Sequence, residues 1–153
     1  MITIPFGINL SDYHIPEIKT DYSTRNTFKL FHLGAMDWKP NMEGVVWFLE
    51  DIWSQTSTDF PKFSLHLAGR NMPDWLLEDE VGNFVNHGEV ASANQFMMDH
   101  DIMIVPLLSA GGMRVKIIEG MALGKVVIST SIGAEGINCN DRENILIANT
   151  KEE

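Results

Sequence analysis

The sequence is poor in cysteine, in basic residues and in long apolar runs, and each shortage excludes a class of protein. The single cysteine, Cys139, excludes an intrachain disulfide and a cysteine-based zinc cage. Lys and Arg number 11 against 21 Asp and Glu, and the formal net charge of -10 argues against binding of nucleic acid or an anionic membrane surface. No apolar run approaches the roughly 20 residues of a membrane-spanning helix. Any membrane contact is therefore expected to come from outside this domain.

What is present fits one globular domain. The chain has 153 residues, of which 44% are hydrophobic and 21% charged, as in soluble proteins with a proper core. Its first residues, MITIPFGINL, lack the basic leader and long apolar core of a signal peptide. With a single cysteine, this predicts a cytoplasmic protein.

Short apolar runs alternate with segments of helical spacing. Strands are expected at 28–33, 62–69, 83–88, 101–108, 125–130 and 143–148, and helices at 41–53, 73–80, 92–100 and 113–123. The segments DIMIVPLL and KVVIST are apolar enough for strands buried on both faces. Asn41 is expected to cap the first helix, with Pro40 at its start, and Gly124 to end the last one. This order predicts an α/β fold: a Rossmann-like parallel sheet with helices on both faces.

The two ends of the chain differ from this pattern. Residues 1–27 are polar and lack sustained periodicity, so we expect a linker or surface arm before a domain at 28–153. A doubly wound sheet usually closes with a helix, whereas the chain stops at IANTKEE. We therefore expect a piece of a larger protein.

The stretch PLLSAGGMRVKIIEG (106–120) is the strongest candidate for a ligand site. Ligands of parallel sheets bind beyond the carboxyl ends of the strands, and the small residues Ser109, Gly111 and Gly112 follow such an end. The helix expected to begin near Met113 would present free N–H groups, which favour a phosphate.

Three charged residues follow this loop. Arg114 and Lys116 have the wrong sign for a helix N-terminus, which suggests that an anion compensates them. Glu119, a turn later, could accept hydrogen bonds from sugar hydroxyl groups. The same pattern also fits an ordinary loop before a core helix, with Lys116 and Glu119 as a surface pair. The spacing alone leaves both interpretations open.

The remaining residues of this helix have packing interpretations. Val115, Ile118 and Ala122 are expected to line its core face. Gly120 costs about 1 kcal/mol relative to alanine within a helix, which suggests a close backbone approach.

Several segments resemble the donor-binding lobe of family 4-type glycosyltransferases. The densest similarity lies in VPLLSAGGMRVKIIEGMALGKVVISTSIGAEGI, and IPFGIN, HLGAMDWKPNMEGVVWFLEDIW, LHLAGR and VNHGEV agree with it. The resemblance covers nearly the whole chain. It implies the C-terminal half of a GT-B fold, with an acceptor-binding N-terminal lobe elsewhere in the full-length protein.

The resemblance also implies an activity. It predicts a retaining hexosyltransferase-type enzyme that transfers a sugar from a nucleotide diphosphate donor to a glycan, lipid or polysaccharide precursor. No metal or other cofactor is expected, because side chains and a helix N-terminus neutralise the diphosphate. The fragment alone is expected to be inactive, and its catalytic residues remain unknown beyond contributions from Glu119 and Arg114.

Site residues carried over from the resemblance fall into three groups. Glu119 matches the second carboxylate of the family's Glu-x7-Glu motif, which binds ribose, whereas Gly111 replaces the first. The expected diphosphate ligands are Gly111, Gly112, Met113, Arg114 and Lys116. The expected base-binding loop contains His87, Gly88 and Val90. Gly34, Lys39, Arg70 and Ser109 are further candidates, although Gly34 is followed by Ala35 where the family usually has arginine.

The five histidines, His14, His32, His66, His87 and His100, are scattered in the sequence, and we expect no metal site among them. Two alternative functions stay open. A sugar-nucleotide epimerase would use a lobe of the same shape. A receiver-like signalling module would need an acidic pair after the first strand and an aspartate after the third, which this sequence lacks.

Overall fold

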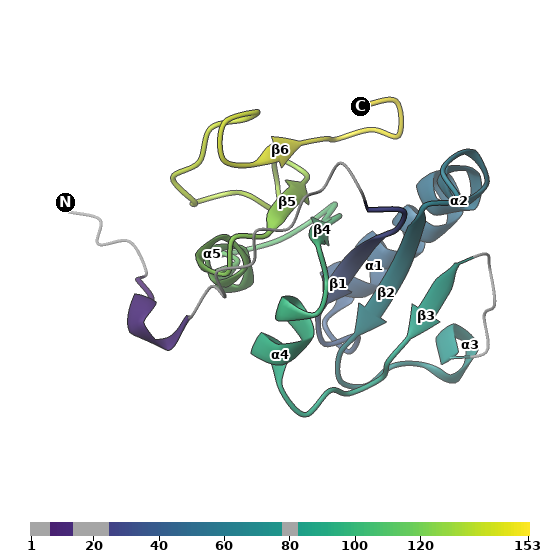
Figure 1. Cartoon of the computed structure of the whole chain (residues 1–153), viewed down its shortest axis with the longest axis horizontal. Coiled ribbons are helices and arrows are strands. Elements are labelled where there is room, and N and C mark those ends of the chain that lie inside the picture. Colours follow the sequence, from purple (N-terminus) through teal and green to yellow (C-terminus); the bar gives the residue numbers. More distant parts are fainter. Residues whose placement is uncertain (1–6, 14–24, 78–82) are drawn as a thin grey trace.

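The computed structural model describes residues 7–13, 25–77 and 83–153. Its centre is an open sheet with the strand order β3-β2-β1-β4-β5-β6, in which every pairing is parallel (Figure 1). The strands are β1 Phe28–Leu33, β2 Phe63–Ala68, β3 Phe84–Asn86, β4 Ile102–Val105, β5 Val126–Ser129 and β6 Leu146–Ile147. The expected parallel α/β fold is confirmed. The order changes direction between β1 and β4, which makes their carboxyl ends the switch point of the sheet.

Helices cover both faces of the sheet. The helices of the described residues are η1 Leu10–Asp12, which has no buried residue, α1 Lys39–Trp47, the π-helical η3 Phe48–Trp53, α2 Ser54–Asp59, α3 Asp74–Leu77, α4 Ala93–Met98 and α5 Val115–Ala122. Figure 1 shows α1 and α2 on one side of the sheet and α4 on the other. The expected helix at 73–80 is described only to Leu77, since 78–82 lie outside the described residues.

Each face of the sheet has its own hydrophobic core. Leu30, Leu65 and Leu67 pack with Val45 of α1 and Trp53 of η3. On the opposite face the core contains Phe31 and Met103, together with Phe96, Met97 and Ile117 from α4 and α5. Successive side chains of a strand point to opposite faces, so neighbours such as Leu30 and Phe31 serve different cores. Val126 is an exception to the expected fully buried β5, because it is half-exposed at the start of that strand.

The helix expected at 41–53 is longer, running without a break through α1, η3 and α2. Pro40 lies in its first turn as expected. The prediction that Asn41 caps it is wrong: Trp38 holds the N-cap position without a side-chain hydrogen bond, and Asn41 is already helical. The Asn41 side chain instead donates a 2.9 Å hydrogen bond to the carbonyl of Ala35 and so fixes the loop after β1.

Helix α5 differs from expectation in its start and in its buried face. Arg114 is the N-cap and the helix begins at Val115, later than the expected Met113. The fully buried residues are Ile117 and Gly120, while Val115, Ile118 and Ala122 are only partly buried. Gly120 does mark a close approach, because a Cβ there would lie 2.9 Å from the sulfur of Met103 on β4. Gly124, with a φ of 68°, follows the helix as expected.

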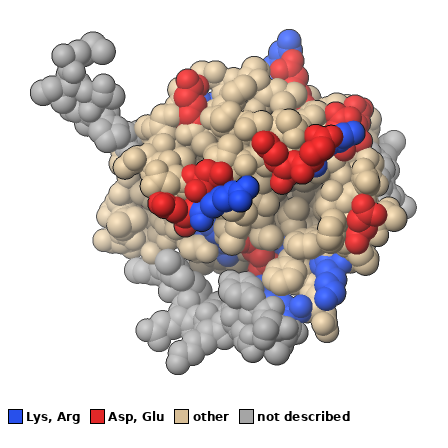
Figure 2. All heavy atoms as spheres, turned by 90° about the horizontal axis from the view of Figure 1, so that it is seen from above, with Lys and Arg blue, Asp and Glu red and all other residues tan. Residues whose placement is uncertain are grey.

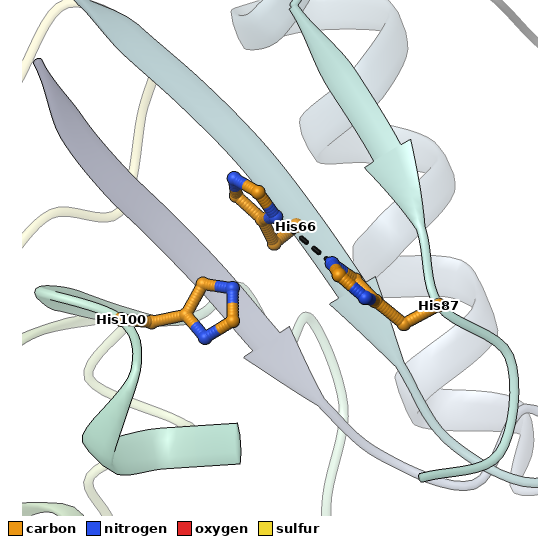
Figure 3. Close-up of side chains that lie close together, drawn as sticks. All are labelled: His66, His87 and His100. Atoms are coloured by element: carbon orange, nitrogen blue, oxygen red, sulfur yellow. Dashed lines mark hydrogen bonds between the residues drawn. The ribbon is translucent and has the colours of Figure 1, made fainter.

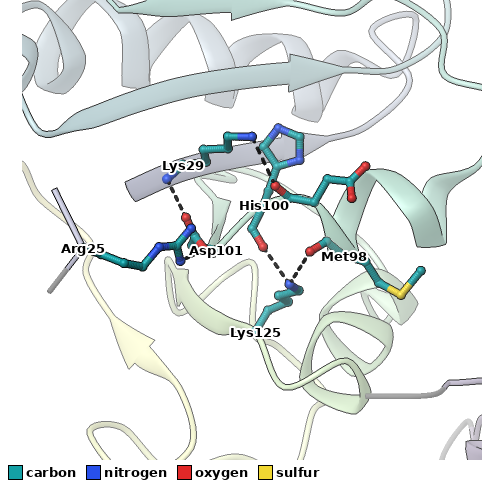
Figure 4. A network of polar contacts seen from close by, with 7 residues as sticks. Arg25, Lys29, Met98, His100, Asp101 and Lys125 are labelled. Atoms are coloured by element: carbon teal, nitrogen blue, oxygen red, sulfur yellow. Dashed lines mark hydrogen bonds and ion pairs between the residues drawn. The ribbon is translucent and has the colours of Figure 1, made fainter. Parts of the chain in front are cut away.

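The amino ends of the strands are held by a polar network (Figure 4). Asp101 forms an ion pair with Arg25 and accepts a 2.8 Å hydrogen bond from the backbone N–H of Lys29. The ammonium group of Lys125 donates to the carbonyls of Met98 and His100, at 3.0 and 2.6 Å. A cation at the last carbonyls of α4 stabilises that helix end. The network fixes the backbone between α4 and β4.

The surface mixes both signs of charge. Figure 2 shows acidic and basic side chains interspersed on the face seen from above, with acidic groups prominent. This agrees with the formal net charge of -10. Among the helices that the structure describes, none has the length and apolar character that crossing a bilayer requires.

Candidate functional site

A cleft of about 320 Å³ opens at the switch point of the sheet. Its walls come from the ends of β1 and β4, the N-cap region of α1 and the first turn of α5. The lining residues are His32, Leu33, Ala35, Trp38, Asn41, Met103, Val105, Leu107, Arg114, Val115, Lys116 and Ile117. Most of this surface is apolar, and its cations come from α5 and the residue before it. Such a mixture suits a ligand with both an apolar and an anionic part.

Arg114 is the most unusual residue of the cleft. Both terminal nitrogens of its guanidinium group are buried, and neither finds a hydrogen-bond partner in the described part of the chain. The group lies over the ring of Trp38, 5.9 Å from its centroid. A buried charge without partners is unfavourable, and stacking on an aromatic ring offsets only part of that cost. An anion in the cleft would satisfy both nitrogens.

Lys116 is the second cation of the cleft. Its ammonium group donates a 2.8 Å hydrogen bond to the carbonyl of Leu33, the last residue of β1. Burial lowers the pKa of Lys116, while the nearby Glu119 carboxylate opposes that shift. An ammonium group has three donors, so one bond to Leu33 leaves capacity for a ligand.

His32 lies beside these cations as a neutral ring. Its Nδ1 contacts the carbonyl of Ile104 at 3.0 Å, and its Nε2 is buried without a partner among the described residues. Burial lowers the pKa of His32 to about 4, and the charge of Lys116 adds to this effect. His32 therefore contributes a neutral imidazole to the floor of the cleft.

The loop before α5 supplies space and backbone donors. Gly112 has a φ of 79°, which favours glycine, and a Cβ on Gly111 or Gly112 would meet nothing within 4 Å. The N-terminus of α5 has no side-chain cap, so its first N–H groups remain available to an anion. Gly111, Gly112 and Met113 immediately precede Arg114 in the sequence, but they are not among the residues that line the cleft.

Glu119 already has a partner. The hydroxyl group of Tyr13 donates a 3.0 Å hydrogen bond to Oε1 of Glu119, so the segment before β1 contacts α5. Burial, followed by this bond and the negative charge of Glu119, raises the pKa of Tyr13. Glu119 lies outside the cleft lining and keeps its second carboxylate oxygen for other donors.

The further candidates are spread around the cleft rather than in it. Lys39 is exposed and pairs with Glu43 at 3.3 Å, and Ser109 donates to the other oxygen of Glu43 at 3.4 Å. Arg70 is exposed, yet near enough for its charge to lower the pKa of Lys116. Gly34 permits a tight loop, because a Cβ would lie 2.5 Å from the Asn41 side chain.

The expected base-binding loop lies beyond β3. Gly88 has a φ of 61° and its carbonyl accepts a 2.8 Å bond from the N–H of Gly69. Val90 packs partly against the core beneath α4. His87 contacts His66 rather than the cleft. Their role toward a base remains a prediction.

Three of the histidines that are scattered in the sequence lie close together in the structure. His66, His87 and His100 come together under α4, with one ring nitrogen of each within 4.8 Å of the others. Sequence reasoning also missed Trp38 and His32 in the cleft and Tyr13 beside Glu119. Of these residues, Trp38 could have been found, because it lies in the segment HLGAMDWKPNMEGVVWFLEDIW that resembles the family.

Together these features define a Rossmann-like domain with a cation-bearing cleft at its topological switch point. A family model described as glycosyl transferases group 1 matches residues 27–153, and the chain belongs to this family. The match confirms the resemblance seen in the sequence and favours a glycosyltransferase over the epimerase and signalling alternatives.

Three known proteins are similar to this chain in sequence or in structure. An uncharacterized 44.6 kDa protein in the cps region of Klebsiella pneumoniae is 28% identical over 149 residues, spanning 89% of this chain and 38% of that protein. The C-terminal domain of the group 1 glycosyl transferase LpcC from Francisella tularensis has a TM-score of 0.68 at 17% identity, over 95% of this chain and 83% of that one. The pneumococcal O-GlcNAc transferase GtfA, solved with UDP and GlcNAc, has a TM-score of 0.60 at 14% identity, over 83% and 26%. The fold is that of a GT-B C-terminal domain, and the chain spans well under half the length of its curated relative.

Proposed function

We propose that this chain is the donor-binding lobe of a retaining glycosyltransferase and holds a nucleotide diphosphate sugar in the cleft at the switch point. The observation that carries the proposal is the guanidinium group of Arg114, whose two buried terminal nitrogens have no hydrogen-bond partner in the described residues. A diphosphate would supply bidentate acceptors to this group. The acceptor would bind to a second lobe of the full-length protein.

The other groups take supporting roles in this proposal. Lys116 adds a second positive charge, and the free N–H groups at the start of α5 bind phosphate oxygens. Glu119 accepts hydrogen bonds from the ribose, and the loop at 87–90 meets the base. As the sugar leaves the donor, negative charge grows on the diphosphate, and preorganised cations stabilise it without a metal ion.

Calorimetry with UDP and uridine tests the diphosphate site, with UDP chosen because GtfA was solved with it. Arg114→Met is expected to weaken UDP binding by about 2 kcal/mol, roughly 30-fold, and to leave uridine unchanged. Lys62→Met is the matched control, because Lys62 is exposed and precedes β2, at the amino ends of the strands, whereas the cleft lies at their carboxyl ends. Equal binding of UDP and uridine by the unaltered chain, or an Arg114 variant that binds UDP normally, would refute the proposal.

A further inference from the structure

Three histidines gather beside the sheet (Figure 3), and none of them lines the cleft. His66 lies in β2, His87 directly follows β3, and His100 lies between α4 and β4. The side chain of His66 points toward α4 because its neighbours Leu65 and Leu67 face the opposite core. The parallel register and the packing of α4 thus bring together three rings from distant parts of the chain.

We infer that His66, His87 and His100 form a binding site for a divalent transition-metal ion of the zinc type. One ring nitrogen of each histidine lies within 4.8 Å of the others, and Nδ1 of His66 is 2.9 Å from Nε2 of His87. Zinc bonds of about 2.0–2.1 Å in a tetrahedron hold nitrogens roughly 3.4 Å apart. Small ring rotations therefore bring all three to coordinating distance and leave a fourth position for water.

His100 supplies the clearest sign of a missing ligand. The residue is 4% exposed, and its Nε2 is buried without a hydrogen-bond partner in the described ranges. Its Nδ1 lies 2.6 Å from the carbonyl of Phe96 and donates its proton there. The Nε2 atom therefore carries a lone pair, and Figure 3 shows the ring turned toward the other two histidines. A buried lone pair without a donor is costly, and a metal ion would use it.

A histidine that binds a metal through one ring nitrogen usually donates a hydrogen bond from the other, and His66 has a partner for such a bond. Nε2 of His66 lies 2.9 Å from the hydroxyl oxygen of Ser64. In the tautomer that we propose for metal binding, Nε2 donates to this oxygen and leaves the Nδ1 lone pair for the metal. In that tautomer, Nε2 of His87 is protonated and donates the hydrogen bond to Nδ1 of His66. On metal binding this proton moves to Nδ1 of the exposed His87 ring by exchange with water, so no net proton is released.

The surroundings keep the rings neutral and reachable. Burial lowers the pKa of His66 to about 4 and lowers the pKa of His87 and His100 as well. Neutral imidazole is the form that binds metals. The positive charge of Lys29 opposes a cation, but its ammonium group faces the carbonyl of Asp99 at 3.5 Å. His87 is exposed and provides the entry path.

Titration of the metal-free chain with zinc chloride, followed by calorimetry and thermal unfolding, tests this inference. We expect one zinc ion per chain and a raised unfolding temperature, since a ligand that binds only the folded state stabilises it. His87→Asn is expected to abolish both effects, and it changes an exposed side chain that should leave the fold intact. Ser64→Ala should weaken zinc about tenfold by releasing the His66 ring.

Matched controls separate this site from other zinc ligands. Cys139→Ser removes the single thiol, and His32→Asn removes a buried histidine outside the cluster; both should bind zinc as the unaltered chain does. Cobalt(II) reports geometry, because four-coordinate cobalt absorbs visible light far more strongly than the six-coordinate aqua ion. Absence of a 1:1 zinc complex, unchanged binding by His87→Asn, or a six-coordinate cobalt spectrum would each overturn the inference.

Discussion

The hydroxyl group of Tyr13 donates a 3.0 Å hydrogen bond to Glu119, a residue 106 positions later in the chain. The bond occupies one oxygen of the carboxylate that we assign to the ribose. In the proposed function, Tyr13 and the nucleotide would therefore use the same side chain of α5.

Tyr13→Phe is expected to raise the affinity for UDP several-fold, because the ribose can then use both carboxylate oxygens of Glu119 instead of one. Glu119→Gln should lower it by roughly 1.5–3 kcal/mol, since a charged acceptor is lost. Calorimetry on both variants measures these changes. If Glu119→Gln binds UDP unchanged while remaining folded, Glu119 serves only the contact with Tyr13.

A bulky side chain in the loop before α5 tests whether this loop contacts the phosphates. Gly111→Leu should weaken UDP binding at least tenfold by obstructing the phosphates, while the unfolding temperature stays unchanged. The second expectation rests on structure: a Cβ on Gly111 meets nothing within 4 Å and the residue has no left-handed φ. Normal UDP binding by this variant would show that the loop lies away from the ligand.

Gly44 sets the position of α1. A Cβ there would lie 2.2 Å from the carbonyl oxygen of Pro106, a backbone atom that cannot move easily. Gly44→Ala should therefore destabilise the fold by about 1–3 kcal/mol, although alanine favours helices by about 1 kcal/mol.

Gly120→Ala is the comparison for this effect. Its Cβ would meet the sulfur of Met103 at 2.9 Å, the mobile part of a flexible side chain. Urea unfolding should show a smaller loss for Gly120→Ala than for Gly44→Ala, and the reverse order would contradict the packing described.

Stability should fall on acidification partly through His32. Its pKa drops from 6.5 to about 4 on folding, so above pH 6.5 the ring is neutral in both states and its contribution is complete. Between about pH 6.5 and pH 4 the ring is protonated in the unfolded chain but neutral in the folded chain. The free energy of unfolding therefore falls by up to about 1.4 kcal/mol per pH unit in this range. Urea unfolding between pH 7 and 4 should show a shallower loss in His32→Asn, and parallel curves would count against this.

Much of the fold could be predicted, because the strands are short apolar runs punctuated by glycine. The charges of Arg114 and Lys116 were likewise visible as misplaced cations at a helix start. The buried face of α5 was misassigned, although Gly120 held the signal. A glycine that permits close approach marks the packed side, which also carries Ile117 three residues earlier.

Contacts between residues far apart in the chain could not be predicted from the sequence. Nothing near Tyr13 indicates a partner on α5, and His66, His87 and His100 meet only once the strand order and the side of α4 are known. The prediction of a cap at Asn41 failed for a local reason: Trp38 starts the helix early, and the Asn41 amide serves the loop after β1.

The excess of acidic groups described above has a kinetic consequence. At a net charge of -10, the chain repels anions at long range, and under the proposed function an anionic nucleotide is attracted only within the cleft. Added salt screens the long-range repulsion over about 8 Å at physiological ionic strength, so encounters become more frequent. The same salt weakens the phosphate contacts once they form. Association and dissociation of the nucleotide should thus both quicken with salt, and the measured affinity conceals two opposed effects.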